Sequence, residues 1–287
     1  MSTQVTTAFV QQYSANVQML SQQMGSRLRD AVRVENMVGK NAFFDQVGSA
    51  TAQKRTSRHA DTPQLDTPHA RRRVSLVDYE YADLIDDQDK VRMLIDPTSA
   101  YAQASAAAMG RAMDDELIAA ATGTAFTGET GSTSTALPAG QQIAAGGADL
   151  TLAKLIEAKK VLDLADVDPS IPRYIAVGPN QIESLLNNTT VTSSDFNTVK
   201  ALVQGDIDTF LGFKFIVTNR LAKSGNDRTC FAWAEDGLAL GVGKDIMARI
   251  DERSDKGYAT QVYYCMSIGA TRMEEEKVVQ IICDESV

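Results

Sequence analysis

Three consecutive acidic residues, Asp114, Asp115 and Glu116, are the first candidates for chemistry, because neighbouring carboxylates can bind a divalent cation. They lie in an Ala-rich stretch, residues 99–123, whose composition predicts a helix. Consecutive helical residues are about 100° apart around the axis, so these three side chains cannot converge on one metal ion. Arg111 precedes Asp115 by one turn, which favours ordinary surface pairing. We therefore expect no metal site here.

The segment Gly241-Val-Gly-Lys-Asp has some likeness to a phosphate-binding loop. Such a loop needs a glycine five positions before its second glycine and Ser or Thr after the lysine. Those positions hold Leu238 and Asp245, so the match fails. A tight hairpin in which glycine adopts a positive φ is the better interpretation. Neither GxSxG nor HExxH occurs, so the sequence gives no catalytic motif.

The histidines and cysteines also give no reactive group. His59 and His69 share one polar segment and have no carboxylate partner fixed by sequence. Three cysteines without a CxxC spacing indicate neither a disulfide framework nor a zinc site, and they suit a reducing compartment. We expect no catalytic residue, no cofactor and no metal ligand.

The charged residues with the clearest grouping lie between residues 54 and 96. Residues 54–73 carry six basic side chains against two acidic ones, a local charge of +4 in a chain of −9. Residues 78–96 then carry seven acidic side chains against two basic ones. Attraction between copies is one interpretation, and two solvated faces are the other. The candidate contact residues are Lys54, Arg55, Arg58, Arg71, Arg72, Arg73, Asp86, Asp87 and Asp89.

Hydrophobic periodicity predicts the elements that position these residues. The stretches flanking the basic segment predict a long two-stranded arm with a basic tip, which needs a surface to lie on. Asp96-Pro97 is a good helix start, and Gly123 can end the helix in the left-handed conformation. An apolar stripe from Phe9 to Met24 predicts an N-terminal helix. The other expected elements are helices at 152–162 and 181–186, strands at 41–49, 74–85, 174–177, 213–218, 258–268 and 278–283, and a hairpin of 230–233 with 238–242.

Length and composition limit the class of protein. A chain of 287 residues with 44% hydrophobic residues can bury a core, so it is not disordered as a whole. Its net charge of −9 opposes non-specific binding to nucleic acid or to an anionic membrane. The N-terminal residues lack the features of a signal peptide, and no apolar stretch reaches membrane-spanning length. We expect a protein that does not enter a membrane and stays in the cytoplasm where it is made.

Two stretches, RRRVSLVDYEYADLIDDQDKVRMLIDP (71–97) and GYATQVYYCMSIGATRMEEEKVVQI (257–281), carry a family resemblance together with the order of the elements. The chain resembles the major capsid proteins of tailed bacteriophages with the HK97 fold. That resemblance implies an α+β fold with an N-arm at 1–38, an extended E-loop hairpin at 39–85, a peripheral domain with a long spine helix at 86–149 and 249–287, and an axial domain at 150–248. Strands 258–268 and 278–283 would share the peripheral domain.

The resemblance also implies function and partners. Copies would assemble into hexamers and pentamers of an icosahedral head that encloses double-stranded DNA without specific binding. The implied partners are a separate scaffolding protein and a portal protein, with a decoration protein as a further candidate, and the implied location is the virion after assembly in the host bacterial cytoplasm. The alternatives are an encapsulin-like compartment and, from another class, a soluble αβ enzyme.

Overall fold

The structure is a computed structural model, and it describes residues 21–55, 57–58, 61–62, 64–86, 98–187 and 209–286, with side chains of the long helix from residue 101 onward. Most of the expected N-terminal helix and the Asp96-Pro97 helix start lie outside these residues. Met24, the last member of the expected stripe, is described; it is non-helical and exposed. Among the described residues, no helix is both long and apolar enough to cross a membrane.

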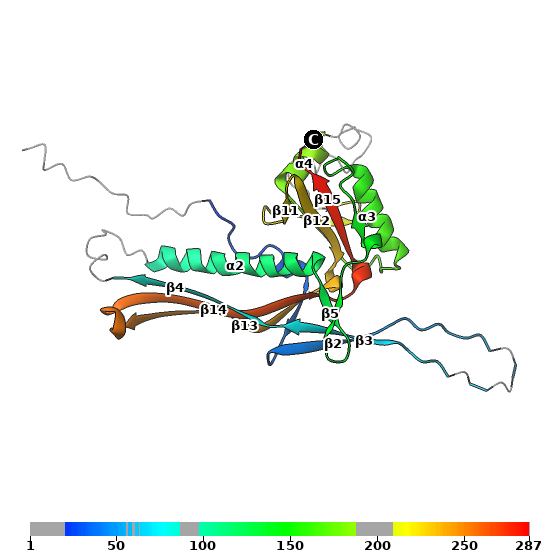
Figure 1. The fold of residues 1–287 in the computed structure, drawn as a ribbon, viewed down its shortest axis with the longest axis horizontal. Coiled ribbons are helices and arrows are strands. Elements are labelled where there is room, and N and C mark those ends of the chain that lie inside the picture. Colours follow the sequence, from blue (N-terminus) through cyan, green and yellow to red (C-terminus); the bar gives the residue numbers. More distant parts are fainter. Residues whose placement is uncertain are drawn as a thin grey trace, which may run out of the picture. The chain divides into compact units, whose positions relative to one another are not determined.

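Most elements with a strong local signal form where the sequence predicts them (Figure 1). The helices are α2 (Thr98–Thr122), α3 (Leu152–Leu164) and α4 (Pro179–Asn187). The strands are β1 (Arg33–Asn36), β2 (Asn41–Val47), β3 (His69–Ser75), β4 (Val77–Ile85), β5 (Ala125–Thr127), β6 (Thr133–Thr135), β7 (Gln142–Ile143), β8 (Arg173–Val177), β9 (Thr209–Phe210), β10 (Phe213–Val217), β11 (Lys223–Ser224), β12 (Asp227–Ala234), β13 (Leu238–Arg253), β14 (Ala259–Arg272) and β15 (Val278–Asp284).

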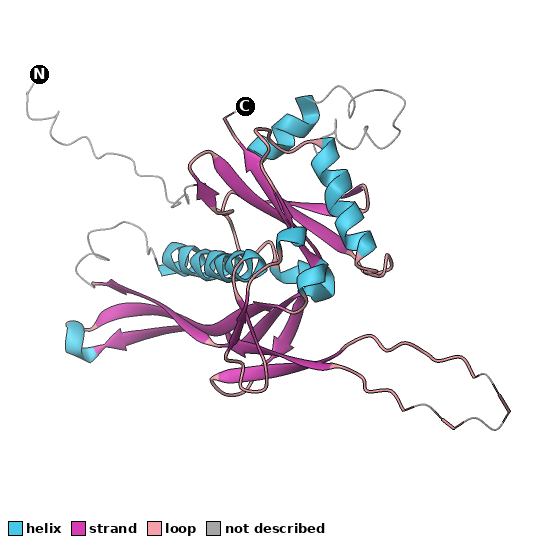
Figure 2. Cartoon of the chain, turned by 45° about the vertical axis from the view of Figure 1, so that its right-hand side comes forward, coloured by secondary structure: helices cyan, strands magenta, loops and turns pink. Residues whose placement is uncertain are grey.

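The described strands form three sheets (Figure 2). The largest has the order β7-β15-β12-β8-β10-β9, with β11 paired to β12. Its central strands are buried, and Phe231, Trp233 and Ile281 are wholly inaccessible to solvent. Because β15 pairs along its whole length with β12, the strands expected at 278–283 and 258–268 lie in different sheets.

A second sheet has the order β2-β3-β5-β6 and contains the base of the expected hairpin. Strands β2 and β3 are antiparallel, from Asn41 opposite Ser75 to Val47 opposite His69. The hairpin is confirmed, but its returning strand is residues 69–75. Residues 77–85 form β4, which belongs to another sheet, so the expected strand 74–85 is two strands with different partners.

The third sheet has the order β1-β13-β14-β4. Strands β12 and β13 lie in different sheets, joined by a 3-10 turn at Glu235–Gly237, so the expected hairpin of 230–233 with 238–242 is wrong.

Gly241 and Gly243 lie inside β13 without a positive φ. The side chains of Met37 and Leu76 pack directly on these two glycines, so a Cβ at either position would require the packed side chain to move. Close packing, and not a turn, explains this motif.

Helix α2 buries one face built from Met109, Met113 and Leu117. It ends at Thr122, and the next residue, Gly123, does not adopt the expected left-handed conformation. Its N–H instead donates to the Ala119 carbonyl oxygen at 2.9 Å, and a Cβ at this position would collide with that oxygen.

The chain divides into two compact units. One contains residues up to Ser26 together with 78–111 and 244–266, and the other contains 27–77, 112–243 and 267–287. The hairpin sheet and the seven-stranded sheet both belong to the second unit.

In the second unit, Glu285 holds the C-terminal end of the chain. Its side chain is only 3% exposed and forms ion pairs with Arg228 and with Lys223, while Gln181 donates to Oε1 at 3.2 Å. The hydrogen bond from Arg228, opposed by burial and assisted by Lys223 and Gln181, lowers the pKa of Glu285 from 4.5 to about 2. The folded state therefore prefers the charged carboxylate.

We predict that Glu285→Gln lowers the free energy of unfolding at pH 7 by roughly 2 kcal/mol. A carboxyl group with a lowered pKa stabilises the fold above its unfolded value near 4.5 and loses this contribution as pH falls through about 2. The gap between wild type and variant should therefore close progressively below pH 4.5, measured by chemical denaturation. The exposed Glu157→Gln is the matched control, and a gap independent of pH would contradict the assignment.

Candidate functional site

The arginine triplet lies in strand β3, at the base of the hairpin and not at its tip. Side chains alternate across a strand, so Arg71 and Arg73 point to one face and Arg72 to the other. Arg71 donates to Asp45 Oδ1 at 2.6 Å, and the Arg73 guanidinium stacks 4.6 Å from the centre of the Phe126 ring. Arg72 is 6% exposed. The expected basic tip therefore consists of Lys54, Arg55 and Arg58 alone.

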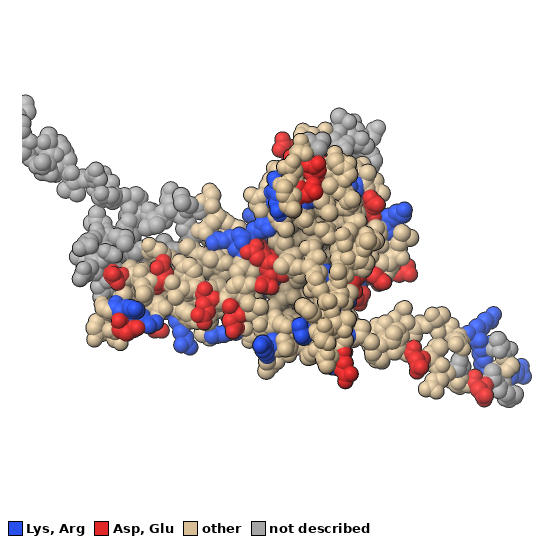
Figure 3. All heavy atoms as spheres, viewed as in Figure 1, with Lys and Arg blue, Asp and Glu red and all other residues tan. Residues whose placement is uncertain are grey.

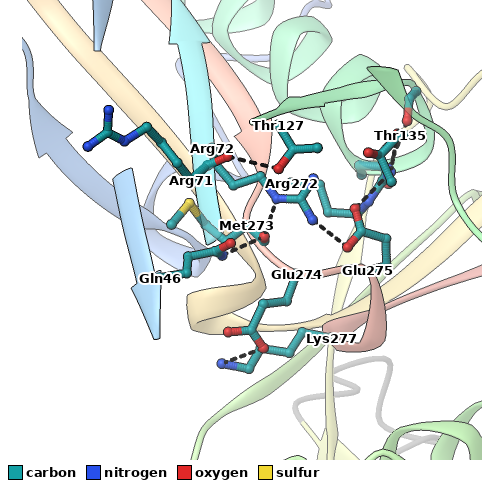
Figure 4. Close-up of polar contacts among 12 residues, drawn as sticks. Gln46, Arg71, Arg72, Thr127, Thr135, Arg272, Met273, Glu274, Glu275 and Lys277 are labelled. Atoms are coloured by element: carbon teal, nitrogen blue, oxygen red, sulfur yellow. Dashed lines mark hydrogen bonds and ion pairs between the residues drawn. The ribbon is translucent and has the colours of Figure 1, made fainter. Parts of the chain in front are cut away.

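Arg72 fixes the hairpin base to the turn after β14 (Figure 4). Its Nε donates to the Met273 carbonyl oxygen at 2.8 Å, and its Nη2 forms an ion pair with Glu275. From β2, Gln46 donates to the same carbonyl oxygen at 2.7 Å. Both strands of the hairpin thus bind one peptide group of a segment some two hundred positions later in the chain.

Arg272 fixes the end of α2 to the same turn. Its side chain is wholly buried, and Nη1 donates to the carbonyl oxygens of Ala121 at 3.1 Å and Gly123 at 2.8 Å. Carbonyl groups at a helix C-terminus lack partners within the helix and carry partial negative charge, so a guanidinium satisfies both needs. Burial lowers the pKa of Arg272 and the charge of Glu275 opposes this, but an arginine remains protonated. Nη2 also reaches the Thr135 carbonyl oxygen at 3.2 Å.

Lys277 extends this polar cluster toward the link between β12 and β13. Its Nζ lies 2.6 Å from Asp236 and 3.3 Å from Glu274. Burial alone would lower the pKa of Lys277, but the hydrogen bond to Asp236 and the charge of Glu274 raise it on balance. We call Arg72, Arg272, Glu275 and Lys277 the hairpin anchor.

A groove of 1210 Å³ opens beside the hairpin anchor. Its walls come from the hairpin base, the link before β7, the end of α3 and the turn after β14. Four carboxylates and one guanidinium line it, and two of these carboxylates, Glu274 and Glu275, are paired with Lys277 and Arg72. Two large apolar side chains on its rim, Leu164 and Val47, are 73% and 67% exposed. The groove is thus acidic with apolar edges.

The expected contact residues lie apart within one chain. Lys54, Arg55 and Arg58 are exposed on the loop between β2 and β3, and Figure 3 shows basic side chains gathered at its far end. Arg55 organises this end by donating to the Ser57 carbonyl oxygen at 2.8 Å and to that of Arg58. Asp86 is exposed, while Asp87 and Asp89 lie outside the described residues.

Asp114 and Asp115 of the acidic triplet lie in different environments, and the expected pairing of Arg111 with Asp115 is wrong. Asp114 is wholly buried and accepts backbone N–H groups of Arg27 and Leu28 at 3.1–3.2 Å. Asp115 pairs with Arg220, and Arg111 donates to Gln22 and Gln23 instead of Asp115. Asp114 therefore holds the segment that leads from the N-terminus into β1.

The cysteines and histidines lie in separate parts of the described chain, except that the thiols of Cys230 and Cys283 are neighbours on the paired strands β12 and β15. Cys230, Cys265 and Cys283 are buried free thiols. His69 begins β3, and His59 lies outside the described residues. Within the described part of the chain, no three His, Cys, Asp or Glu side chains are grouped as a metal site.

Sequence reasoning missed the residues that matter most at this site. Arg272, Glu274, Glu275 and Glu276 form a charged run between two apolar strands, which indicates a turn. Nothing local shows that this turn meets the end of α2 and the hairpin base, because both partners lie more than a hundred positions away.

Comparison with known proteins gives the class of this molecule. The sequence profile of the family described as phage capsid protein matches residues 5–285. The capsid structure of cyanophage P-SCSP1u superposes with a TM-score of 0.76 at 19% identity, covering 100% of this chain and 96% of that one. The capsid of Ralstonia phage GP4 gives 0.75 at 10% identity, covering 96% and 95%. A Mycobacterium phage Che8 structure gives 0.68 at 16% identity, covering 95% and 97%. Among curated protein sequences, none matches.

The structural likeness at these identities establishes the fold, and the profile match over nearly the whole chain establishes the family. The predicted α+β HK97-like capsid fold is confirmed. The chain belongs to the phage capsid protein family, whose members are structural proteins. This result favours the capsid over the encapsulin-like and enzyme alternatives.

We predict that Arg72→Ala lowers the free energy of unfolding by about 3 kcal/mol, because it leaves the largely buried Glu275 without its closest cation. The matched control is Arg71→Ala, which removes an exposed pair with Asp45 and should therefore cost much less stability than Arg72→Ala. Denaturant titration of the purified protein measures both. Equal losses in the two variants would show that Arg72 has no special structural role.

We also predict that Asp114→Ala costs about 2 kcal/mol, since it leaves two backbone N–H groups in a buried region without their acceptor. Its neighbour provides the comparison: Asp115→Ala removes a partly exposed pair and should change stability by less than about 1 kcal/mol. Thermal melting followed by circular dichroism distinguishes them, and a larger loss for Asp115→Ala would refute this account.

Proposed function

We propose that this chain builds an icosahedral phage head from hexamers and pentamers, in which the hairpin of each subunit reaches a neighbouring copy. The observation that carries the proposal is the match to the phage capsid family over residues 5–285, together with a hairpin whose base is held by buried ion pairs and whose far end is exposed and basic. An extended ribbon of this kind has little core of its own, and a neighbour would supply the surface that it needs.

The proposed contact is electrostatic. Lys54, Arg55 and Arg58 would face an acidic surface of another copy, for which Asp86, Asp87 and Asp89 are the candidates from sequence. Each exposed pair contributes on the order of 0 to 1 kcal/mol, so a single contact is reversible. Repetition over many copies would give a shell that corrects errors while it grows. Arg71, Arg72 and Arg73 have partners within their own subunit, which favours a structural role for them.

Further parts of the proposal rest on the family resemblance. We propose that a separate scaffolding protein directs assembly in the host cytoplasm, that a portal protein occupies one position of the shell, that a decoration protein is a further candidate partner, and that double-stranded DNA is packaged without specific binding. The division into N-arm, E-loop, peripheral domain and axial domain stays a prediction. The pairing of β15 with β12 supports placing residues 278–284 with the axial part.

Electron microscopy of the protein co-expressed with a scaffolding partner tests the proposal. We expect round shells or ring-shaped capsomers, and we expect assembly to weaken as salt rises, because exposed charge pairs are screened beyond about 8 Å at physiological ionic strength. A protein that stays monomeric at high concentration with its scaffolding partner present would contradict the proposed function.

A further inference from the structure

The groove beside the hairpin anchor lacks an assigned role, and its chemistry indicates a cationic occupant. Its charged lining consists of Asp166, Glu274, Glu275 and Glu276 against Arg72. Asp166 and Glu276 are exposed, so their carboxylates can accept charge-assisted hydrogen bonds from a lysine or arginine side chain that enters the groove.

The apolar rim adds a second requirement. Leu164 and Val47 are among the most exposed large apolar side chains of the chain, and both line the groove. Side chains that combine an alkyl stem with a charged end cover such surfaces well. The occupant should therefore be a basic segment with long side chains or an adjacent apolar residue.

The loop end between β2 and β3 has this composition. Lys54, Arg55 and Arg58 are exposed there, and Leu65 on the returning side is 44% exposed. By contrast, the first 24 residues carry no charged side chain, so the N-terminal segment does not complement an acidic groove. Charge and apolar character together select the loop end.

The loop end cannot fill the groove of its own subunit. The groove is lined by Gln46–Ser49 and Pro68, at the base of the same hairpin. Residues 48–54 in extended form span about 23 Å, at roughly 3.3 Å per residue. Figures 1 and 2 show the described parts of the loop leaving the β2-β3 sheet and running away from β5. The occupant must come from another copy.

We infer that the groove is the receptor for the hairpin end of the next subunit. This inference rests on the proposed function and deepens it, because it names the acidic surface that the hairpin meets. Tip and groove are different patches at opposite ends of one hairpin, so the contact is heterologous. Contacts of this kind close into rings when the rotation between subunits allows it. The receptor is then Asp166, Glu274 and Glu276, in place of the acidic run that includes Asp86 and Asp87.

A charge exchange tests the inference. The tip variant is Lys54→Glu with Arg58→Glu, and it keeps Arg55, which organises the loop end. The groove variant is Asp166→Asn with Glu276→Lys; both positions are exposed, and asparagine tolerates the positive φ of 54° at position 166. Each variant alone should reduce the yield of particles in sedimentation at least tenfold, while circular dichroism stays that of the wild type. The combined variant should recover most of the yield.

The outcomes separate the two proposals. Wild-type particles with no recovery in the combined variant would overturn the groove as receptor and leave the proposed function intact. The control combines Asp86→Lys and Asp87→Lys with the tip variant. If this combination recovers the particle yield and the combination with the groove variant does not, the inference is overturned in favour of the acidic run. A wild type that forms no particles contradicts the proposed function itself.

A covalent readout tests proximity directly. The three native cysteines are buried, so introduced surface thiols can react selectively. Oxidation by dissolved oxygen with a copper catalyst should link Arg58→Cys of one subunit to Leu164→Cys of the next in assembled particles. Non-reducing electrophoresis should then show a ladder of linked subunits. Absence of linked dimers, or a ladder only for Arg58→Cys with Asp86→Cys, would overturn the inference.

Discussion

The buried guanidinium of Arg272 is the interaction on which the second unit depends. It occupies the place where the last carbonyl groups of α2 need donors, and where β14 ends and the turn toward β15 begins. The Arg272 guanidinium has no exposed surface, and removing its charge from water is costly. Loss of a carbonyl oxygen that accepts from it would leave part of this desolvation cost without compensation. The carbonyl oxygens of α2 and Thr135 and the nearby Glu275 together offset it. The end of α2, strand β14 and the β5-β6 region therefore keep one arrangement.

Glu275 passes this constraint to the hairpin. It is shared by Arg72 and Arg272, which come from segments far apart in the chain, and its own position is limited by the short 3-10 turn Glu275–Lys277. The Met273 carbonyl oxygen then accepts from both β2 and β3. The direction in which the hairpin leaves the sheet is thereby set by a turn near the C-terminus. The loop beyond it can be long and polar because its base supplies the order.

The sequence predicted what local physics determines. Helix α3, strand β8 and helix α4 have their periodicity and caps within a few residues, and the side chain of Thr151 caps α3 as its composition allows. The errors occur where a distant segment decides the outcome. Asp114 looks like a surface residue until the backbone at Arg27 approaches it, and Gly241 looks like a turn until Met37 packs on it. The alternation of Arg71 to Arg73 was visible in the sequence, but only the register with β2 shows which face is buried.

The division between strong internal contacts and weak exposed ones follows the needs of a shell. Contacts within the subunit involve buried ions and backbone carbonyl groups, whose loss is costly, so the subunit would keep its shape during the proposed assembly. The loop end offers solvated charges, each of which contributes little. If internal and external contacts were equally strong, a misplaced copy would be trapped; if they were equally weak, the hairpin would not hold its direction. The anchor would then allow the proposed intersubunit contact to be weak, because the entropy of ordering the hairpin base is offset within the subunit before two copies meet.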